Sequence, residues 1–335
     1  MNLVNQQFRL ARRPSGLPAR DTWELIEEPV AEPGEGEIAV EVLYTSLDPA
    51  MRGWLNEGES YVPPVGVGEV MRALGVGRVI ASGDPRLQPG EHVRGLFGVQ
   101  RYAVVGGEGV EKVDLATAPL TSYLSALGMT GMTAYFGLLE IGRPQQGQTV
   151  VVSAAAGAVG SIAGQIAKIK GCRAVGIAGG PEKCRLVTEE YGFDTAIDYK
   201  AGNVSRALHE ACPDGIDVYF DNVGGEILEA ALRNLARGAR IVICGAISQY
   251  NEGAMSGPRN YMALLIKRAR MEGFVVFDFA SRYTEAANEI GAWIAEGRLR
   301  SREHLVDGLE AFPEALLMLY NGANTGKLIL KVGGS

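Results

Sequence analysis

The pattern of hydrophobic and polar positions changes once along this chain, near Tyr123. Before that point, short apolar runs are separated by Pro-Gly turns such as the one in LQPGEHV. Apolar runs of this length between Gly and Pro residues predict β-strands, and many short strands joined by such turns favour a small barrel-like β-domain. The expected strands are Trp23–Glu28, Ile38–Leu43, Gly75–Ser82 and two within His92–Val105.

After Tyr123 the apolar positions take a helical spacing as far as Gly142, with a glycine-containing break. Short apolar runs then alternate with helical stretches, which predicts a doubly wound parallel sheet and therefore an α/β fold. The expected strands are Thr149–Ser153, Arg173–Ile177, Thr195–Ile197, Ile216–Phe220, Arg240–Cys244 and Glu272–Val276.

The chain is less regular after Trp293. Pro313 is placed to open a helix, because a first helical position needs no N–H donor, and Asn321-Gly322 is placed to end it. A last strand is expected in Gly326–Val332.

Length and composition limit the number of domains and the class of protein that can be expected. The chain has 335 residues, more than one hydrophobic core usually serves, so two domains are expected. Its 47% apolar and 21% charged residues are ordinary for a globular protein. The net charge is −7 and no basic block stands out, so we expect no nucleic-acid partner.

Nothing in the sequence directs the chain to a membrane. The opening MNLVNQQFRLARRP has no apolar core of a signal peptide, and no stretch approaches the ~20 apolar residues of a membrane span. The four cysteines are widely spaced, which argues against a disulfide framework or a zinc lobe. A cytoplasmic location is the expectation.

The stretch AAAGAVGS, directly after the first strand of the α/β half, holds the first candidate site. It is the dinucleotide-binding pattern G-x-G-x-x-G with Ala155 in place of the first glycine, followed by Gly157 and Gly160. Gly157 would let the backbone approach a pyrophosphate, and Gly160 would let the following helix pack closely. The glycines alone fit a plain tight turn equally well, but their position between a strand and a helix favours the nucleotide.

The second strand of this half indicates which nucleotide binds. An NAD site usually has a carboxylate there for the ribose hydroxyl, but this strand ends in Ala178-Gly179-Gly180 and Lys183 follows. A positive charge suits a 2′-phosphate, so NADPH is the expected cofactor. The alternative is that Lys183 is a solvated helix residue compensated by Glu182.

With these residues in hand, the chain resembles the medium-chain dehydrogenase/reductase superfamily, and within it the zinc-independent prostaglandin and curcumin reductase group of NADPH-dependent 2-alkenal reductases. The resemblance implies a GroES-like β-barrel catalytic domain in residues 1–125 and 298–335, a Rossmann domain in residues 126–297, and a homodimer. The matching stretches, in family order, are SLDPAMRG, GMTGMTAYFGL, AAAGAVGS, GGPEKC, FDNVGGE, CGAISQYN, EGFVV and NTGKLIL.

The resemblance also assigns residues to the cofactor. It places the pyrophosphate on Gly157, Ala158, Val159 and Gly160, and the adenosine end on Lys183 and Tyr199. The remaining cofactor residues that it implies lie mostly toward the nicotinamide: Met129, Thr133, Asn222, Cys244, Gly245, Ala246, Ile247, Tyr250, Phe274, Val275, Val276 and Asn324. Taken one at a time, Asn222 and Asn324 could be turn residues, Phe274 could be core, and the Cys244 side chain is better explained as a small buried hydrophobe.

The sequence lacks the metal ligands of the zinc-dependent relatives. Their Gly-His-Glu motif corresponds here to a stretch with Val67 and Gly68, and the three histidines have no ligand spacing. Without zinc, reduction of a conjugated C=C bond is easier to support than alcohol oxidation, since the charge delocalises to an enolate oxygen. Tyr250 is the candidate catalytic donor, and a purely structural hydrogen bond that closes its loop is equally open.

Substrate identity is the least constrained prediction. Family members often have a tyrosine where this chain has Ala50, so the pocket is expected to be enlarged, with Tyr44 and Tyr61 as candidate walls. Arg52 is expected to be structural, paired with Asp48. The leading function is an NADPH-dependent reductase of α,β-unsaturated ketones or aldehydes. The alternatives are a quinone reductase on the same scaffold and a non-catalytic NADPH-binding protein.

Overall fold

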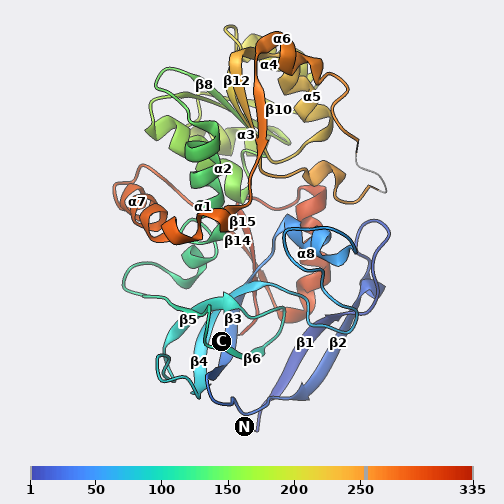
Figure 1. Ribbon diagram of the computed structural model, residues 1–335, viewed down its shortest axis with the longest axis vertical. Coiled ribbons are helices and arrows are strands. Elements are labelled where there is room, and N and C mark those ends of the chain that lie inside the picture. The colour runs from blue at the N-terminus through green and yellow to red at the C-terminus, as the bar shows by residue number, and fades with distance from the viewer. Residues whose placement is uncertain (1, 253–255, 334–335) are drawn as a thin grey trace. The chain divides into compact units, whose positions relative to one another are not determined.

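The computed structural model of the protein describes residues 2–252 and 256–333 and divides into two compact units (Figure 1). One unit consists of Ser125–Arg302, and the other of Met1–Leu124 together with Glu303–Ser335. The chain therefore leaves one unit, builds the other, and returns.

The unit from Ser125 to Arg302 contains a six-stranded parallel sheet in the order β10-β9-β8-β11-β12-β13. The chain starts in the middle at β8, winds outward to β10, and then restarts on the other side of β8 at β11. This is the strand order of a Rossmann fold, which confirms the expected α/β class. The strands are β8 (Thr149–Ser153), β9 (Arg173–Ala178), β10 (Thr195–Asp198), β11 (Ile216–Asp221), β12 (Leu235–Ile243) and β13 (Arg270–Gly273).

Helices cover both faces of this sheet (Figure 1). On one face α1 (Met129–Phe136) contacts both α2 (Ala158–Ile169) and α7 (Tyr283–Ala295). On the other face α4 (Val204–Ala211), α5 (Gly225–Arg233) and α6 (Met262–Lys267) pack together on strand residues such as Val151, Tyr219 and Ile241. The short α3 (Pro181–Arg185) follows β9. Apolar side chains on both faces explain why the strands read as continuous apolar runs.

Two sequence-based assignments in this unit were wrong. The strand expected at Glu272–Val276 lies at Arg270–Gly273, because only these residues pair with β12. Phe274 to Val276 instead lead into a 3-10 helix at Val276–Arg282. The helix expected over residues 123–142 is divided into a 3-10 turn at Leu120–Tyr123, α1, and a wider turn at Gly137–Gly142.

The other unit is built mainly on antiparallel strands, with one parallel pair, β14 and β15. Its larger sheet has the order β14-β15-β3-β4-β5-β7, with β6 also paired to β3, and β1 forms a separate ribbon with β2. Of these strands, β1, β7 and β14 have no counterpart among the sequence-based predictions. The strands are β1 (Val4–Leu10), β2 (Trp23–Pro29), β3 (Glu37–Ser46), β4 (Leu74–Ser82), β5 (His92–Leu96), β6 (Tyr102–Gly106), β7 (Glu111–Lys112), β14 (Glu303–Asp307) and β15 (Lys327–Lys331).

The C-terminal segment completes the core of this unit. β15 pairs antiparallel with β3, and α8 (Phe312–Asn321) inserts Phe312 between aromatic rings. The Phe312 ring centroid lies 5.2 Å from that of Phe8 and 4.9 Å from that of Trp23. The predicted end of α8 is confirmed, because Gly322 caps it with a left-handed φ of 69°.

The expected ion pair between Arg52 and Asp48 was wrong. Arg52 is buried and donates to the carbonyls of Pro14 and Gly16 and to the Asn56 side chain, so its role is structural. Asp48 instead accepts from the buried ammonium of Lys327, which also donates to the Leu47 carbonyl. The partner of Asp48 comes from β15, nearly the whole chain away.

Among the described residues, no helix combines the length and apolarity needed to span a bilayer.

Candidate functional site

The carboxyl ends of β8 and β11 form the centre of the candidate site. The strand order reverses between these two strands, and ligands of such sheets bind outside their carboxyl ends. Asn222, the first residue after β11, donates from its side chain to the Ser153 carbonyl at 2.8 Å and from its backbone to the Ser153 hydroxyl at 2.8 Å. Asn222 thus joins the loops that follow the two strands.

The glycine loop after β8 is shaped by close backbone approach. A Cβ at Gly160 would lie 2.3 Å from the Ala154 carbonyl oxygen, so only glycine allows α2 to start this close to the strand. A Cβ at Gly157, the N-cap of α2, would lie 3.1 Å from the same oxygen. Ala158 and Val159 form the first turn of α2, whose N–H groups suit an anion. Ala154, the residue before the position of the replaced glycine, has a left-handed φ of 50°.

Asp221, the last residue of β11, organises the loops around it. Its buried carboxylate accepts from the backbone of Val223 and Gly224 and from the hydroxyls of Tyr219 and Ser153, at 2.9 to 3.1 Å. Burial raises the pKa of Asp221 above its ordinary value, although these hydrogen bonds oppose the shift. The sequence analysis missed Asp221, and its signal was a carboxylate directly after the apolar run Val218–Phe220.

The loop after β12 contains five of the predicted residues, from Cys244 to Tyr250, and is tied to the same place. The backbone N–H groups of Cys244 and Gly245 donate to the Asp221 carbonyl, and that of Ile247 donates to Asn222. Cys244 is half-buried, and desolvation raises the pKa of its thiol to about 12, so this side chain stays neutral.

Tyr250 lies folded back on its own loop. Its hydroxyl accepts from the Ala246 N–H at 3.2 Å, and a Cβ on Gly245 would lie 2.8 Å from the hydroxyl oxygen. This is the structural hydrogen bond that the sequence analysis left open as an alternative. A hydroxyl that accepts one hydrogen bond keeps its proton as a donor, so the contact is compatible with either role.

The loops after β9 and β10 form a basic corner at the other end of the site. The Tyr199 ring lies over Gly179, where a Cβ would approach it to 2.8 Å, and the Lys200 ammonium lies 5.9 Å from the ring centroid. Asp198 accepts from the N–H groups of Gly180 and Lys200, which lowers the pKa of its carboxyl. Burial and the nearby Lys200 lower the pKa of Lys183. Two lysines close enough to repel one another form a corner suited to an anion.

A tyrosine that the sequence analysis missed, Tyr283, contacts two of the predicted residues, Met129 and Val276. A third, Thr133, is hydrogen-bonded to Met129. The Tyr283 hydroxyl donates to the Val276 carbonyl at 3.0 Å and lies 3.7 Å from the Met129 sulfur. The Thr133 hydroxyl donates to the Met129 carbonyl at 2.7 Å, one turn back along α1.

Phe274 and Val275 are half-buried. A Cβ at Gly137, the residue after α1, would approach the Phe274 ring to 2.5 Å. Phe274 therefore packs against the end of α1, which agrees with the alternative that it is a core residue.

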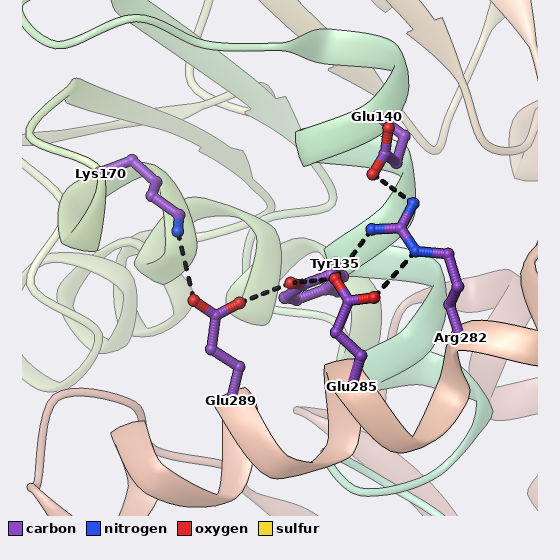
Figure 2. Close-up of polar contacts among 6 residues, drawn as sticks. All are labelled: Tyr135, Glu140, Lys170, Arg282, Glu285 and Glu289. Carbon is purple, nitrogen blue, oxygen red and sulfur yellow. Dashed lines mark hydrogen bonds and ion pairs between the residues drawn. The ribbon is translucent and has the colours of Figure 1, made fainter.

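A polar network holds α7 against α1 behind these residues (Figure 2). The buried Tyr135 hydroxyl of α1 donates to Glu289 of α7, which also lies 3.5 Å from the Lys170 ammonium. Arg282 bridges Glu285 and Glu140, with N–O distances of 2.8 and 2.6 Å. Burial and then Glu289 raise the pKa of Tyr135, so it stays a neutral donor.

The remaining predicted residues lie in the unit that contains the chain termini. Tyr44 is on β3 beside Val76 and Leu74, and Ala50 is in the 3-10 helix Pro49–Leu55. Tyr61 is 55% exposed, and the Asn324 side chain donates to the Gly326 carbonyl at 3.1 Å. These four residues belong to a different unit from the nucleotide loops.

In the ranges that the structure describes, His, Cys, Asp and Glu side chains form no group of three or more suited to a metal ion. The absence of zinc from the working protein stays a prediction.

Comparisons with known proteins agree with this fold over the whole chain. Residues 6–113 match the family described as N-terminal domain of oxidoreductase, and residues 158–292 match the family described as zinc-binding dehydrogenase. The chain is 43% identical to NADPH-dependent curcumin reductase of Escherichia coli, covering 98% of this chain and 97% of that protein. It is 41% identical to the NADP(+)-dependent 2-alkenal reductase of Nicotiana tabacum, covering 98% and 97%.

The crystal structure of CurA from Vibrio vulnificus in complex with NADPH has the same fold, with a TM-score of 0.94 and 43% identity. The match covers 98% of this chain and 100% of that chain.

Proposed function

Because the chain belongs to the medium-chain dehydrogenase/reductase family, in the group of the curcumin, 2-alkenal and prostaglandin reductases, we propose that it reduces the C=C bond of α,β-unsaturated ketones and aldehydes with NADPH. The observation that carries the proposal is the match, over nearly the full length of both chains, to two reductases of conjugated substrates at more than 40% identity.

The residues of the nucleotide-binding unit fit NADPH. The bare backbone at Gly157 and Gly160 leaves space beside the N-terminus of α2, where free N–H groups favour a pyrophosphate. Lys183 and Lys200 supply positive charge for a 2′-phosphate, and Asp198 is already engaged by two backbone N–H groups. We propose that Tyr199 lies on the adenosine, and that Met129, Thr133, Asn222, Cys244 to Ile247, Phe274 to Val276 and Asn324 line the nicotinamide.

NADPH, when bound, supplies a hydride for the β-carbon of the substrate. The protein then has to stabilise the negative charge on the carbonyl oxygen and allow a proton to reach the α-carbon. We propose Tyr250 as the catalytic donor to that oxygen, with its loop held in place by the Ala246 N–H. We propose Tyr44, Ala50 and Tyr61 as the residues that shape the substrate pocket, without a metal ion at the position of Val67 and Gly68.

Anaerobic oxidation of NADPH with a panel of enones, enals and quinones tests the proposal, with NADH in parallel and products identified by mass. Saturated carbonyl products formed with NADPH in strong preference to NADH would support both the reaction and the role of Lys183. Hydroquinone products alone would make the protein a quinone reductase. Tight NADPH binding with no acceptor reduced would support a non-catalytic binding protein.

Tyr250→Phe separates the two roles of this tyrosine. If the hydroxyl stabilises the developing charge, kcat falls by about 100–1,000-fold, the range typical for removing one such donor, and the Kd for NADPH is nearly unchanged. Tyr102→Phe, a hydroxyl on a strand of the other unit, is the matched control. An unchanged kcat would remove Tyr250 from the mechanism.

We also propose that the protein is a homodimer. Four apolar side chains on and beside α6 are about half to two thirds exposed, and an apolar patch of this kind often marks a protein interface. The neighbouring β13 is an outer strand of the sheet, with an edge that another chain could pair with. These side chains are Tyr261, Met262, Leu265 and Ile266.

Light scattering coupled to size exclusion tests the dimer and its surface. Leu265→Asp should give monomers, whereas Leu96→Asp, at an apolar position of similar exposure in the other unit, should not. A monomeric wild-type protein would overturn the proposal, and a dimer that survives Leu265→Asp would place the interface elsewhere.

We propose a cytoplasmic location as well. The four cysteines, all within the described residues, are free thiols, which suits a reducing compartment. Cell fractionation with an antibody to the protein tests it.

A further inference from the structure

Four arginines gather at the edge of the sheet opposite the nucleotide loops. Arg240 and Arg270 are paired across β12 and β13, near the amino ends of the parallel strands. Arg143 precedes β8, and Arg268 lies between α6 and β13. Together with Gln145, Gly238 and Ala239, these residues line a cavity of about 370 Å³ that is open to solvent. A phosphate group is much smaller than this volume.

The positive charge of this cavity is incompletely neutralised. Among the residues that the structure describes, Arg143, Arg240 and Arg268 form no ion pair, and Arg270 lies 3.3 Å from Glu272. Arg240 donates to the Arg143 carbonyl and the Gln148 side chain, both neutral, and its buried Nε has no hydrogen-bond partner within the described ranges. The remaining carboxylate that acts on Arg240 is Asp217, which accepts from the Thr149 N–H.

Backbone geometry adds a second, independent observation. Arg143 and Arg268 both have left-handed backbones, with φ of 45° and 52°, at the end of a helical segment. Glycine is the residue that suits such caps, so an arginine there needs a reason in its side chain. Each guanidinium donates one hydrogen bond to a carbonyl of the preceding turn, from Arg143 to Glu140 and from Arg268 to Ile266. A guanidinium has five N–H donors, so most of them remain for a ligand.

We propose that this cavity, named here the arginine cavity and lined by Arg143, Gln145, Arg240, Arg268 and Arg270, binds a small phosphate-bearing anion. Planar guanidiniums bind phosphate oxygens with paired hydrogen bonds, and several of them around one cavity favour a multiply charged oxyanion over chloride. Binding would neutralise charges that otherwise repel one another and would supply an acceptor for the buried Nε of Arg240. The site is separate from the proposed NADPH site and does not depend on it.

Thermal unfolding of the full-length protein in saturating NADP⁺, at constant ionic strength set with NaCl, tests the proposal. Inorganic phosphate and glycerol phosphate are the two probes, so that a free ion and a phosphate ester are distinguished. We expect a saturable rise in Tm with at least one probe. An equal rise with NaCl alone, or no rise with either probe, would overturn the proposal.

The variants Arg143→Gly and Arg268→Gly keep the test free of folding failure. Glycine relieves the left-handed backbone, so each variant should be at least as stable as the wild type without phosphate. The variant should bind the probe at least about tenfold more weakly than the wild type, because a charge-assisted hydrogen-bonding group is lost. Arg206→Gln, an exposed arginine on α4, is the control and should bind the probe as the wild type does.

Two results would assign the arginines another role. Loss of the phosphate effect in Lys183→Gln, with the effect retained in Arg268→Gly, would place the ion in the nucleotide site. A change of oligomeric state in Arg268→Gly, with phosphate binding unchanged, would show that the guanidiniums serve contact between copies. Either result contradicts the proposal.

Discussion

At the scale of single residues, two buried ionisable side chains hold distant segments together. Asp221 gathers four donors at the carboxyl end of β11, and Lys327 joins β15 to the Leu47-Asp48 turn. A buried charge is stable only while its partners are present, so each makes a measurable prediction.

Asp221 should make stability depend on pH. Because its pKa is raised in the folded protein, the folded state binds a proton that the unfolded state releases above its ordinary pKa of roughly 3.9. The contribution is therefore fully present below that pH and is lost as pH rises through the raised value. Asp221→Asn should remove this loss, which urea unfolding between acid and neutral pH would detect. If the free energy of unfolding changed with pH by the same amount in the wild type and in Asp221→Asn, the prediction would be wrong.

Removing the Lys327 ammonium should be costly. Lys327→Met keeps the bulk of the side chain but leaves the Asp48 carboxylate, which is 23% exposed, without its charged partner, so we expect a loss of about 1–3 kcal/mol. Lys331→Met, on the same strand, disrupts an exposed pair with Asp307 and should cost at most about 1 kcal/mol. Urea unfolding of the two variants checks the difference, and equal losses would show that the buried pair is not special.

The sequence predicts single residues only where local geometry decides. Gly157 and Gly160 were identified because a strand, a turn and a helix follow one another within a few residues. Asp221 was missed because only the fold buries its carboxylate and brings Ser153 of β8 beside it. Arg52 was given the wrong partner for the same reason, since the true partner of Asp48 lies on β15.

At the scale of elements, close contacts between neighbours set the spacing of α2 and β8. Gly160→Ala would place a methyl group 2.3 Å from the Ala154 oxygen, so the helix has to move away from the strand. We expect a loss of about 1–3 kcal/mol in stability and weaker NADPH binding. Gly291→Ala in α7, whose Cβ would be 3.8 Å from Leu127, should instead stabilise by up to about 1 kcal/mol. Thermal unfolding and NADPH titration of both variants are the measurements.

The network in Figure 2 should contribute to the docking of α7 on α1. Tyr135→Phe removes the hydroxyl that donates to Glu289 and should cost about 1.5–3 kcal/mol, the usual value for a hydrogen bond to a charged group. A double-mutant cycle with Glu289→Gln should show a coupling of at least ~0.5 kcal/mol. Additive losses would mean that the two side chains act independently.

Elements were predictable where burial is uniform along the strand. The runs at β8, β9 and β11 are apolar because helices cover both faces, and they were found nearly to the residue. The apolar run from Phe274 to Val276 is not paired with β12, so apolarity misplaced β13. The strand β14 was missed because its residues are mostly polar or half-exposed.

At the scale of the whole molecule, the chain closes its first unit with its last segment. Ending the chain at Arg302 would remove Phe312, Leu316, Leu328 and Leu330 from the core of that unit. At about 1.5–3 kcal/mol for each large side chain, the loss is comparable to the stability of a typical domain. We expect proteases to cut within residues 1–124 while residues 125–302 stay protected, as mass spectrometry of the fragments would show. Protection of both parts would contradict the interpretation.

The same return of the chain has a consequence for its synthesis. β3 leaves the ribosome long before β15, which pairs Ile329 with Ser46. At roughly 5–20 residues per second, the nascent chain carries an unfinished sheet for on the order of ten seconds or more, while the nucleotide-binding unit has already been made in full. An open strand edge of this kind can pair with other chains, so we expect the first segment to be prone to aggregation until translation is complete.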